Sequence, residues 1–241
     1  MQGSNLEEGT CVKMAKQQTQ QQASLLQPIT DWYQGKNCIN HDVQGRFDRL
    51  MQEKKRYVTT PGRTDMEIAW KLLIGTHQNR LHNVKARPYR DKAVKKLAND
   101  KTWTKLSQFS TFEDLFDYMK QLLTMNYIGQ VTIYDVCLRM TKCFEPSLCP
   151  KDYVYVHATI YDALVQLQKK GMFKQTVSLK NNSRISITHF AQLFGNIDSC
   201  YIEDILCCIG KQVRNYKAHK LPASQLDMQL YNLLIQLKII P

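Results

Sequence analysis

Residues 128–140 read IGQVTIYDVCLRM, and this stretch decides how the middle of the chain is expected to fold. A glycine is followed at once by a threonine suited to a helix start, and then by a run with apolar side chains at helical spacing. A similar run covers about 111–125, with Ser110 or Thr111 placed before it as a cap. The sequence therefore predicts two helices, about 111–125 and 131–143, joined by a tight glycine turn.

The turn and the start of the second helix have the composition of a phosphate-binding backbone. Glycine permits a backbone conformation that side chains would block, and it lets the main chain approach a ligand closely. Free amides at a helix N-terminus attract anions, and the helix dipole adds to that attraction. We therefore expect a cradle for nucleic-acid phosphate at Gly129, Gln130, Val131 and Thr132. The alternative is an ordinary helical hairpin in which Gly129 serves only the turn.

The hairpin sequence resembles the helix-hairpin-helix DNA-binding family. Residues 125–129 read MNYIG where the family usually carries Leu-Pro-Gly-Ile-Gly, so the second glycine is present and Tyr127 takes the place of the first. The resemblance implies binding to the backbone of duplex DNA. Such binding is largely independent of base sequence and weakens with salt.

A longer resemblance connects the chain with the endonuclease III-like DNA glycosylases. Residues 154–158 read VYVHA, which places His157 on a family histidine and Tyr155 where the catalytic aspartate stands. Val131 occupies the position of the nucleophilic lysine of bifunctional members. Each departure removes a catalytic group. Without the lysine no Schiff base can form, and without the carboxylate a developing sugar cation is not stabilised. The candidate catalytic residues that remain are Asp135, Asp152 and His157.

The chain is also similar to uncharacterised bacterial proteins that share three of its segments. These read Ile-Gly-x-x-Thr-x-Tyr-Asp at 128–135, Val-Tyr-x-His-Ala at 154–158 and Ile-Glu-Asp-x-Leu-Cys at 202–207. The similarity implies a shared fold over about 95–210. In the third segment Glu203 and Asp204 are expected to form a solvated edge near a helix start, where the dipole favours acids. The alternative is a joint catalytic set of His157 with Asp135 or Asp204.

The charge of the chain favours an acidic partner. Lys and Arg total 33 against 21 Asp and Glu among 241 residues, which gives a net charge of +12 and a pI near 9.3. Nucleic acid is the first candidate partner and an anionic membrane the second. A basic cluster covers about 80–105, and its predicted nucleic-acid contacts are Arg87, Arg90, Lys92, Lys95 and Lys96. The alternative is a basic face exposed only to solvent.

The eight cysteines contain no Cys-x-x-Cys pair, and the first residues contain no apolar signal core. The cysteines are therefore interpreted as reduced thiols, and the protein is expected to be cytoplasmic. A zinc site from Cys137, Cys143, Cys149 and His157 fits no standard ligand spacing, so neither a metal nor a cofactor is expected. No hydrophobic stretch is long enough to span a membrane.

The predicted fold class is all-α, with a single multi-helix domain. Residues 1–27 are expected to form a flexible Gln-rich leader, and 28–241 the helical domain, with the helix-hairpin-helix core at about 111–170. Ser224 with Asp227 is expected to cap the last helix. A small β-hairpin is predicted near 173–187. The other predicted helices cover about 41–57, 64–74, 156–169, 187–195, 200–215 and 223–239.

The sequence thus predicts a non-sequence-specific DNA-binding protein, which acts through the helix-hairpin-helix and a basic surface and without catalysis. One alternative is a divergent DNA glycosylase-like enzyme. Another is a protein-interaction scaffold, in which exposed side chains on 200–215 and 223–239 bind a protein partner or a second copy of the chain.

Overall fold

The computed structural model describes residues 24–34, 87–98, 105–106, 108–123, 128–141 and 148–241. The predicted helices at 41–57 and 64–74 lie outside these residues. Within them the chain is mostly helical, with one small two-stranded sheet. No helix among the described residues is both long and apolar enough to cross a bilayer.

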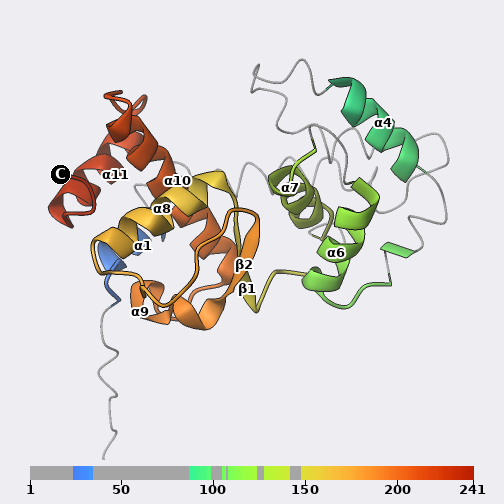
Figure 1. Ribbon diagram of the computed structural model, residues 1–241, viewed down its shortest axis with the longest axis horizontal. Coiled ribbons are helices and arrows are strands. Elements are labelled where there is room, and N and C mark those ends of the chain that lie inside the picture. Colours follow the sequence, from blue (N-terminus) through green and yellow to red (C-terminus); the bar gives the residue numbers. More distant parts are fainter. Residues whose placement is uncertain (1–23, 35–86, 99–104, 107, 124–127, 142–147) are drawn as a thin grey trace, which may run out of the picture.

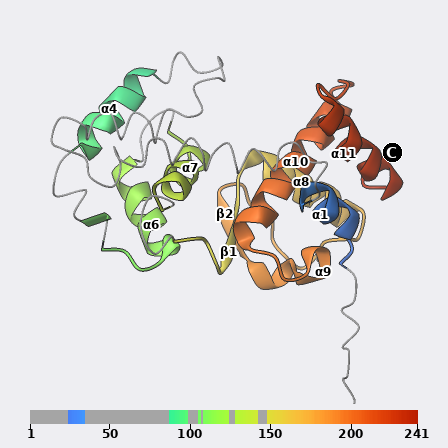
Figure 2. The ribbon, with the colours of Figure 1, turned by 180° about the vertical axis from the view of Figure 1, so that it is seen from behind.

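The elements form two lobes that lie side by side in Figures 1 and 2. The first lobe contains α4 (Arg87–Leu97), α6 (Phe112–Leu123) and α7 (Gln130–Thr141). The second lobe contains the following elements: α1 (Gln27–Gln34), β1 (Tyr153–Val156), α8 (Ala158–Lys169), β2 (Ser183–Ser186), the 3-10 turn η2 (Ile187–His189), α9 (Ala191–Phe194), α10 (Ser199–Lys217) and α11 (Gln225–Gln236). The helices predicted near 111–125, 131–143, 156–169, 200–215 and 223–239 correspond to α6, α7, α8, α10 and α11.

Two of the helix starts follow directly from capping side chains. The backbone N–H of Asp114 donates to the Thr111 hydroxyl oxygen at 3.2 Å, so Thr111 caps α6. The N–H of Asp227 donates to the Ser224 hydroxyl oxygen at 3.1 Å, which confirms the predicted cap of α11. Each bond satisfies an amide that the first turn of a helix otherwise leaves free.

The predicted hairpin near 173–187 is wrong in its pairing. Strand β2 pairs antiparallel with β1, so that Tyr153 faces Ser186 and Val156 faces Ser183. The segment after α8 does not pair because it closes the end of that helix: the N–H groups of Met172 and Phe173 both donate to the carbonyl of Leu167, at 2.9 and 3.2 Å. Phe173 is then buried in the core.

Strand β1 contributes to both hydrophobic clusters of the molecule. Tyr155 packs in the cluster of the first lobe, whereas its neighbours Val154 and Val156 belong to that of the second lobe. Alternate side chains of a strand point to opposite faces, so three of the four residues of β1 contribute to two cores. This strand is therefore the structural junction of the two lobes.

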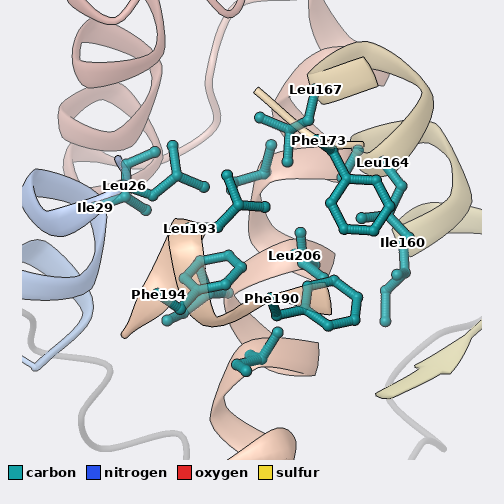
Figure 3. Close-up of a cluster of buried hydrophobic side chains, with 14 of the residues drawn as sticks. Leu26, Ile29, Ile160, Leu164, Leu167, Phe173, Phe190, Leu193, Phe194 and Leu206 are labelled. Atoms are coloured by element: carbon teal, nitrogen blue, oxygen red, sulfur yellow. The ribbon is translucent and has the colours of Figure 1, made fainter. Parts of the chain in front are cut away.

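The core of the second lobe includes side chains from α1 and from the residues just before it. Leu26 and Ile29 are completely buried, and Figure 3 shows them beside Leu193 and Phe194. The N–H of Leu26 also donates to the carbonyl of Leu193 at 2.9 Å. Leu26 had been placed in the predicted leader, and the structure makes it a core residue. The proposed division of the chain into leader and domain otherwise stays a prediction.

The first lobe does not display the expected DNA-binding motif. Helices α6 and α7 pack against each other, but residues 124–127 of the connection lie outside the described residues and a helix-hairpin-helix is not shown. The coarse prediction of a mostly helical protein is confirmed, while the sheet makes the all-α class only partly correct.

Candidate functional site

The predicted phosphate cradle at the start of α7 lacks the property that its glycine was expected to supply. Gly129 does not adopt a positive φ, and a Cβ added to it would meet nothing within 4 Å. Its carbonyl accepts from the N–H of Ile133 at 3.2 Å, as the residue before a helix commonly does. The backbone there is thus open to any residue type, and glycine is not required by the turn.

The neighbouring predicted contacts have ordinary positions on α7. Val131 is 37% exposed and Thr132 is half-buried. The amide of Gln130 lies between two groups of the protein: turned to pair donors with acceptors, its oxygen accepts from Lys120 Nζ at 2.8 Å and its nitrogen donates to the Asn182 carbonyl at 3.1 Å. Gln130 therefore connects α6, α7 and the turn before β2.

The predicted basic contacts belong to α4. Lys92, Lys95 and Lys96 are exposed on this helix. Arg87 and Arg90 lie in the same helix, and their side chains are outside the described part of the structure. The opposite side of α4 buries Ala93, Val94 and Leu97 against α6, which explains why the lysines face outward.

Among the three candidate catalytic residues, His157 lies against a buried carboxyl group. His157 precedes α8, makes no side-chain cap, and lies with its Nε2 atom 3.3 Å from Oε1 of Glu203 on α10. Asp135 is half-buried on α7, and Asp152 is exposed beside β1. The structure brings His157 together with Glu203, not with Asp152. The expectation that Glu203 forms a solvated edge is wrong, because this side chain is buried.

A third titratable group completes this contact. The Tyr134 hydroxyl of α7 hydrogen-bonds to the Glu203 carboxyl group. Tyr134, Glu203 and His157 are only 3%, 7% and 8% exposed. Burial raises the pKa of Glu203 to about 7, although its bonds to His157 and Tyr134 oppose the shift. Burial also raises the pKa of Tyr134 well above its ordinary value. The contact can exchange protons internally, but its atoms are closed to bulk solvent.

Asp204, the residue after Glu203, has a separate partner. The Tyr33 hydroxyl of α1 donates to Asp204 Oδ2 at 2.6 Å. Burial raises the pKa of the Asp204 carboxyl, and its hydrogen bond from Tyr33 opposes that shift. This pair fastens the first described helix to α10 and lies within the second lobe.

An open depression lies beside α6. Its volume is about 370 Å³, and it is lined by Lys105, Gln108, Phe109, Ser110, Asp114, Asp117, Tyr118 and Gln121. The Lys105 Nζ atom lies 4.6 Å from the centre of the Tyr118 ring. Phe109 packs beside that ring at a centroid distance of 5.3 Å. The lining of this depression cannot be recognised in the sequence, because its residues are scattered along 105–121 and form no known motif.

One family model matches the chain, and it covers this region. Residues 93–182 match the model of the D-glucuronyl C5-epimerase C-terminus. The matched stretch extends from α4 to the turn before β2, and it includes every residue of the depression. Comparison with curated proteins and with solved structures gives no significant match.

This match corrects the identification made from the sequence. The family found is the C-terminal part of an epimerase, so the resemblance to helix-hairpin-helix DNA-binding proteins and to endonuclease III-like glycosylases was wrong. The prediction of DNA binding, which depended on that resemblance, was wrong with it. Short glycine turns between helices recur in unrelated folds.

The described residues contain no group of three or more His, Cys, Asp or Glu side chains placed to hold a metal ion. Cys137, considered above as a zinc ligand, is completely buried in the first lobe, and burial raises the pKa of its thiol. His157 faces Glu203 instead.

Proposed function

We propose that this chain binds an acidic carbohydrate of the uronate class in the depression beside α6. The observation that carries the proposal is the position of the depression. It lies entirely within the residues that match the C-terminus of a D-glucuronyl C5-epimerase, and it pairs a lysine with an aromatic ring.

The lining suits a sugar that carries one carboxylate. A pyranose ring presents a face of C–H groups, which packs well on an aromatic face such as that of Tyr118 or Phe109. Lys105, held above the Tyr118 ring, can bind the carboxylate without moving far. Its ammonium group is exposed, so the ligand reaches it from solvent.

Polar side chains complete the recognition of hydroxyl groups. Gln108, Ser110 and Gln121 are exposed at the depression and offer both donors and acceptors. Asp114 and Asp117 already have partners, because Thr111 donates to Asp114 and Arg184 pairs with Asp117. Their carboxylates therefore remain fixed in place and can accept from sugar hydroxyls.

The size of the depression limits the ligand. Pockets for small molecules usually measure about 300–1,000 Å³, and 370 Å³ is at the lower end of this range. The site fits the end or a short stretch of a glycan chain, and the rest of the chain would lie on the surface. The net charge of +12 favours an anionic polymer in the same way.

The proposal concerns binding, and no reaction is included in it. Epimerisation beside a carboxylate needs one group to remove a proton and another to return it from the opposite face. The buried Tyr134–Glu203–His157 contact is closed to a sugar of that size.

The test is a calorimetric titration with a hexasaccharide of alternating D-glucuronic acid and N-acetyl-D-glucosamine. The matched probe is the same hexasaccharide with its carboxyl groups reduced to alcohols. We expect the acidic probe to bind and the reduced probe to bind at least about tenfold more weakly, as loss of a charge-assisted contact predicts.

A pair of lysine variants locates the binding. Lys105→Gln should weaken binding of the acidic probe by about tenfold, whereas Lys174→Gln, at an exposed lysine outside the depression, should leave it unchanged. Equal binding of the two probes, equal binding by Lys105→Gln and the parent, or no binding at all would each overturn the proposal.

A further inference from the structure

A buried polar contact joins the two lobes. Tyr134 comes from α7 in the first lobe, whereas Glu203 comes from α10 and His157 from the segment between β1 and α8 in the second. We propose that this contact is a pH-sensitive joint, which holds the lobes together while Glu203 carries its proton and loosens when Glu203 ionises. The proposal is independent of carbohydrate binding.

The geometry gives Glu203 two partners from two directions. One carboxyl oxygen lies 3.3 Å from His157 Nε2, and the group also accepts from the Tyr134 hydroxyl. A protonated carboxyl can use its O–H toward a neutral imidazole and still accept from the tyrosine, so every polar atom is satisfied. All three residues are less than one-tenth exposed.

The surroundings penalise the ionised form of Glu203. On its own helix the neighbouring Ile202 and Leu206 are completely buried. The charged or titratable groups facing it are His157, Tyr134 and Asp135, of which Asp135 adds a negative charge from α7. Cys200, also on α10, faces Tyr134. A carboxylate formed here is poorly solvated and is repelled by Asp135, and this cost exceeds the stabilisation from His157 and Tyr134, so hydration of the joint relieves it.

Asp204 supplies a matched control on the same helix. Burial raises the pKa of the Asp204 carboxyl, as it does that of Glu203, and the Asp204 carboxyl also accepts from a tyrosine hydroxyl. Its hydrogen-bond partner Tyr33 belongs to α1, so this bond joins two elements of the same lobe, and the charge of Asp135 on α7 acts on Asp204 only as the smallest contribution to its raised pKa. Removing its charge should leave the joint between the lobes unchanged.

Hydrogen–deuterium exchange of the α7 peptides, in the full chain at about pH 5.5 and about pH 8.5, tests the proposal. Exchange times are corrected for the chemical effect of pH. In the parent, protection of α7 should fall about thirtyfold at the higher pH, because about 1.5 pH units separate 5.5 from the raised pKa of Glu203 and each unit corresponds to a factor of ten. Glu203→Gln keeps both hydrogen-bonding positions and cannot ionise, so its α7 should remain protected at both pH values. Asp204→Asn should behave as the parent does.

Two results would overturn the joint. One is equal protection of α7 in the parent at both pH values. The other is a Glu203→Gln variant in which α7 loses as much protection at the higher pH as it does in the parent. If circular dichroism shows that Glu203→Gln is unfolded, the same exchange experiment on Tyr134→Phe tests the joint instead. This substitution removes the hydrogen bond between the lobes, so α7 should be weakly protected at both pH values, and the parent's full pH response in this variant would contradict the proposal.

Discussion

The Nε2 atom of His157 lies 3.3 Å from Oε1 of Glu203, and both side chains are buried between the lobes. Two acid–base groups at this distance would suggest catalysis if they faced solvent. Here they face each other and the hydroxyl of Tyr134. The depression beside α6 is open to solvent, and in it an exposed lysine lies over the partly buried ring of Tyr118.

The first prediction concerns the pH dependence of stability. Burial raises the pKa of Glu203 from 4.5 to about 7 in the folded protein. Between these values the folded chain holds a proton that the unfolded chain has lost, so the free energy of unfolding should fall as pH rises from about 4.5 to about 7. The fall amounts to roughly 3 kcal/mol at about 1.4 kcal/mol per pKa unit. Urea unfolding at a series of pH values measures it.

Glu203→Gln should remove this fall, because a glutamine does not titrate. Asp204→Asn is the comparison, since it leaves Glu203 in place. A Glu203→Gln variant whose stability falls over the same window as the parent's would show that another group is responsible.

A second prediction concerns the attachment of α1. Tyr33→Phe removes a hydroxyl that donates to Asp204 Oδ2 at 2.6 Å and leaves a partly buried carboxyl without this partner. We expect a loss of about 1–3 kcal/mol in the free energy of unfolding, the usual cost of an unsatisfied buried polar group. Chemical denaturation of Tyr33→Phe, Asp204→Asn and the double variant gives the coupling energy. Strictly additive effects would mean that this hydrogen bond does not hold α1 in place.

Much of the helical arrangement is predictable from local sequence, and the site is not. The stripe Phe112, Leu115, Phe116 and Met119 predicts α6, and Ser224 with Asp227 predicts the start of α11, because both signals are local. The pairing of β1 with β2 depends on residues far apart in the chain, since Tyr153 faces Ser186, 33 positions later. Periodicity alone cannot reveal such a partner.

The same reasoning explains the error about Glu203. Adjacent acids near a helix start usually face solvent, and Asp204 with Glu203 fits that pattern. Their burial depends on Tyr33 and Tyr134, which come from other helices. The prediction for Gly129 has a similar weakness. The residue type suggested a backbone conformation that only glycine adopts, and the φ angle shows that the conformation at this position does not require glycine.

A third prediction separates two contributions of Arg184, which joins β2 to α6. Its guanidinium carbon lies 5.3 Å from the ring centres of both Phe116 and Tyr155, and the group also pairs with Asp117. Asp117 is half exposed, so Asp117→Asn should cost less than about 1 kcal/mol. Arg184→Ala also loses the ring contacts and should cost about 1–2 kcal/mol. Thermal unfolding of both variants measures the difference, and equal losses would mean that the rings contribute nothing.

The last prediction compares two glycines in helical surroundings. Helices α8 and α10 approach so closely at Gly210 that an added Cβ would overlap the backbone carbonyl of Thr159. Gly210→Ala must push the two helices apart and should lower the free energy of unfolding by about 2–3 kcal/mol, as overpacking of a core does. Gly129→Ala is the matched change, because a Cβ there meets nothing within 4 Å and φ is not positive. Its effect should remain within about 0.5 kcal/mol. Urea denaturation of both variants under one condition makes the comparison. A large loss for Gly129→Ala, or none for Gly210→Ala, would contradict the close packing of α8 on α10 as the feature that requires glycine in this fold.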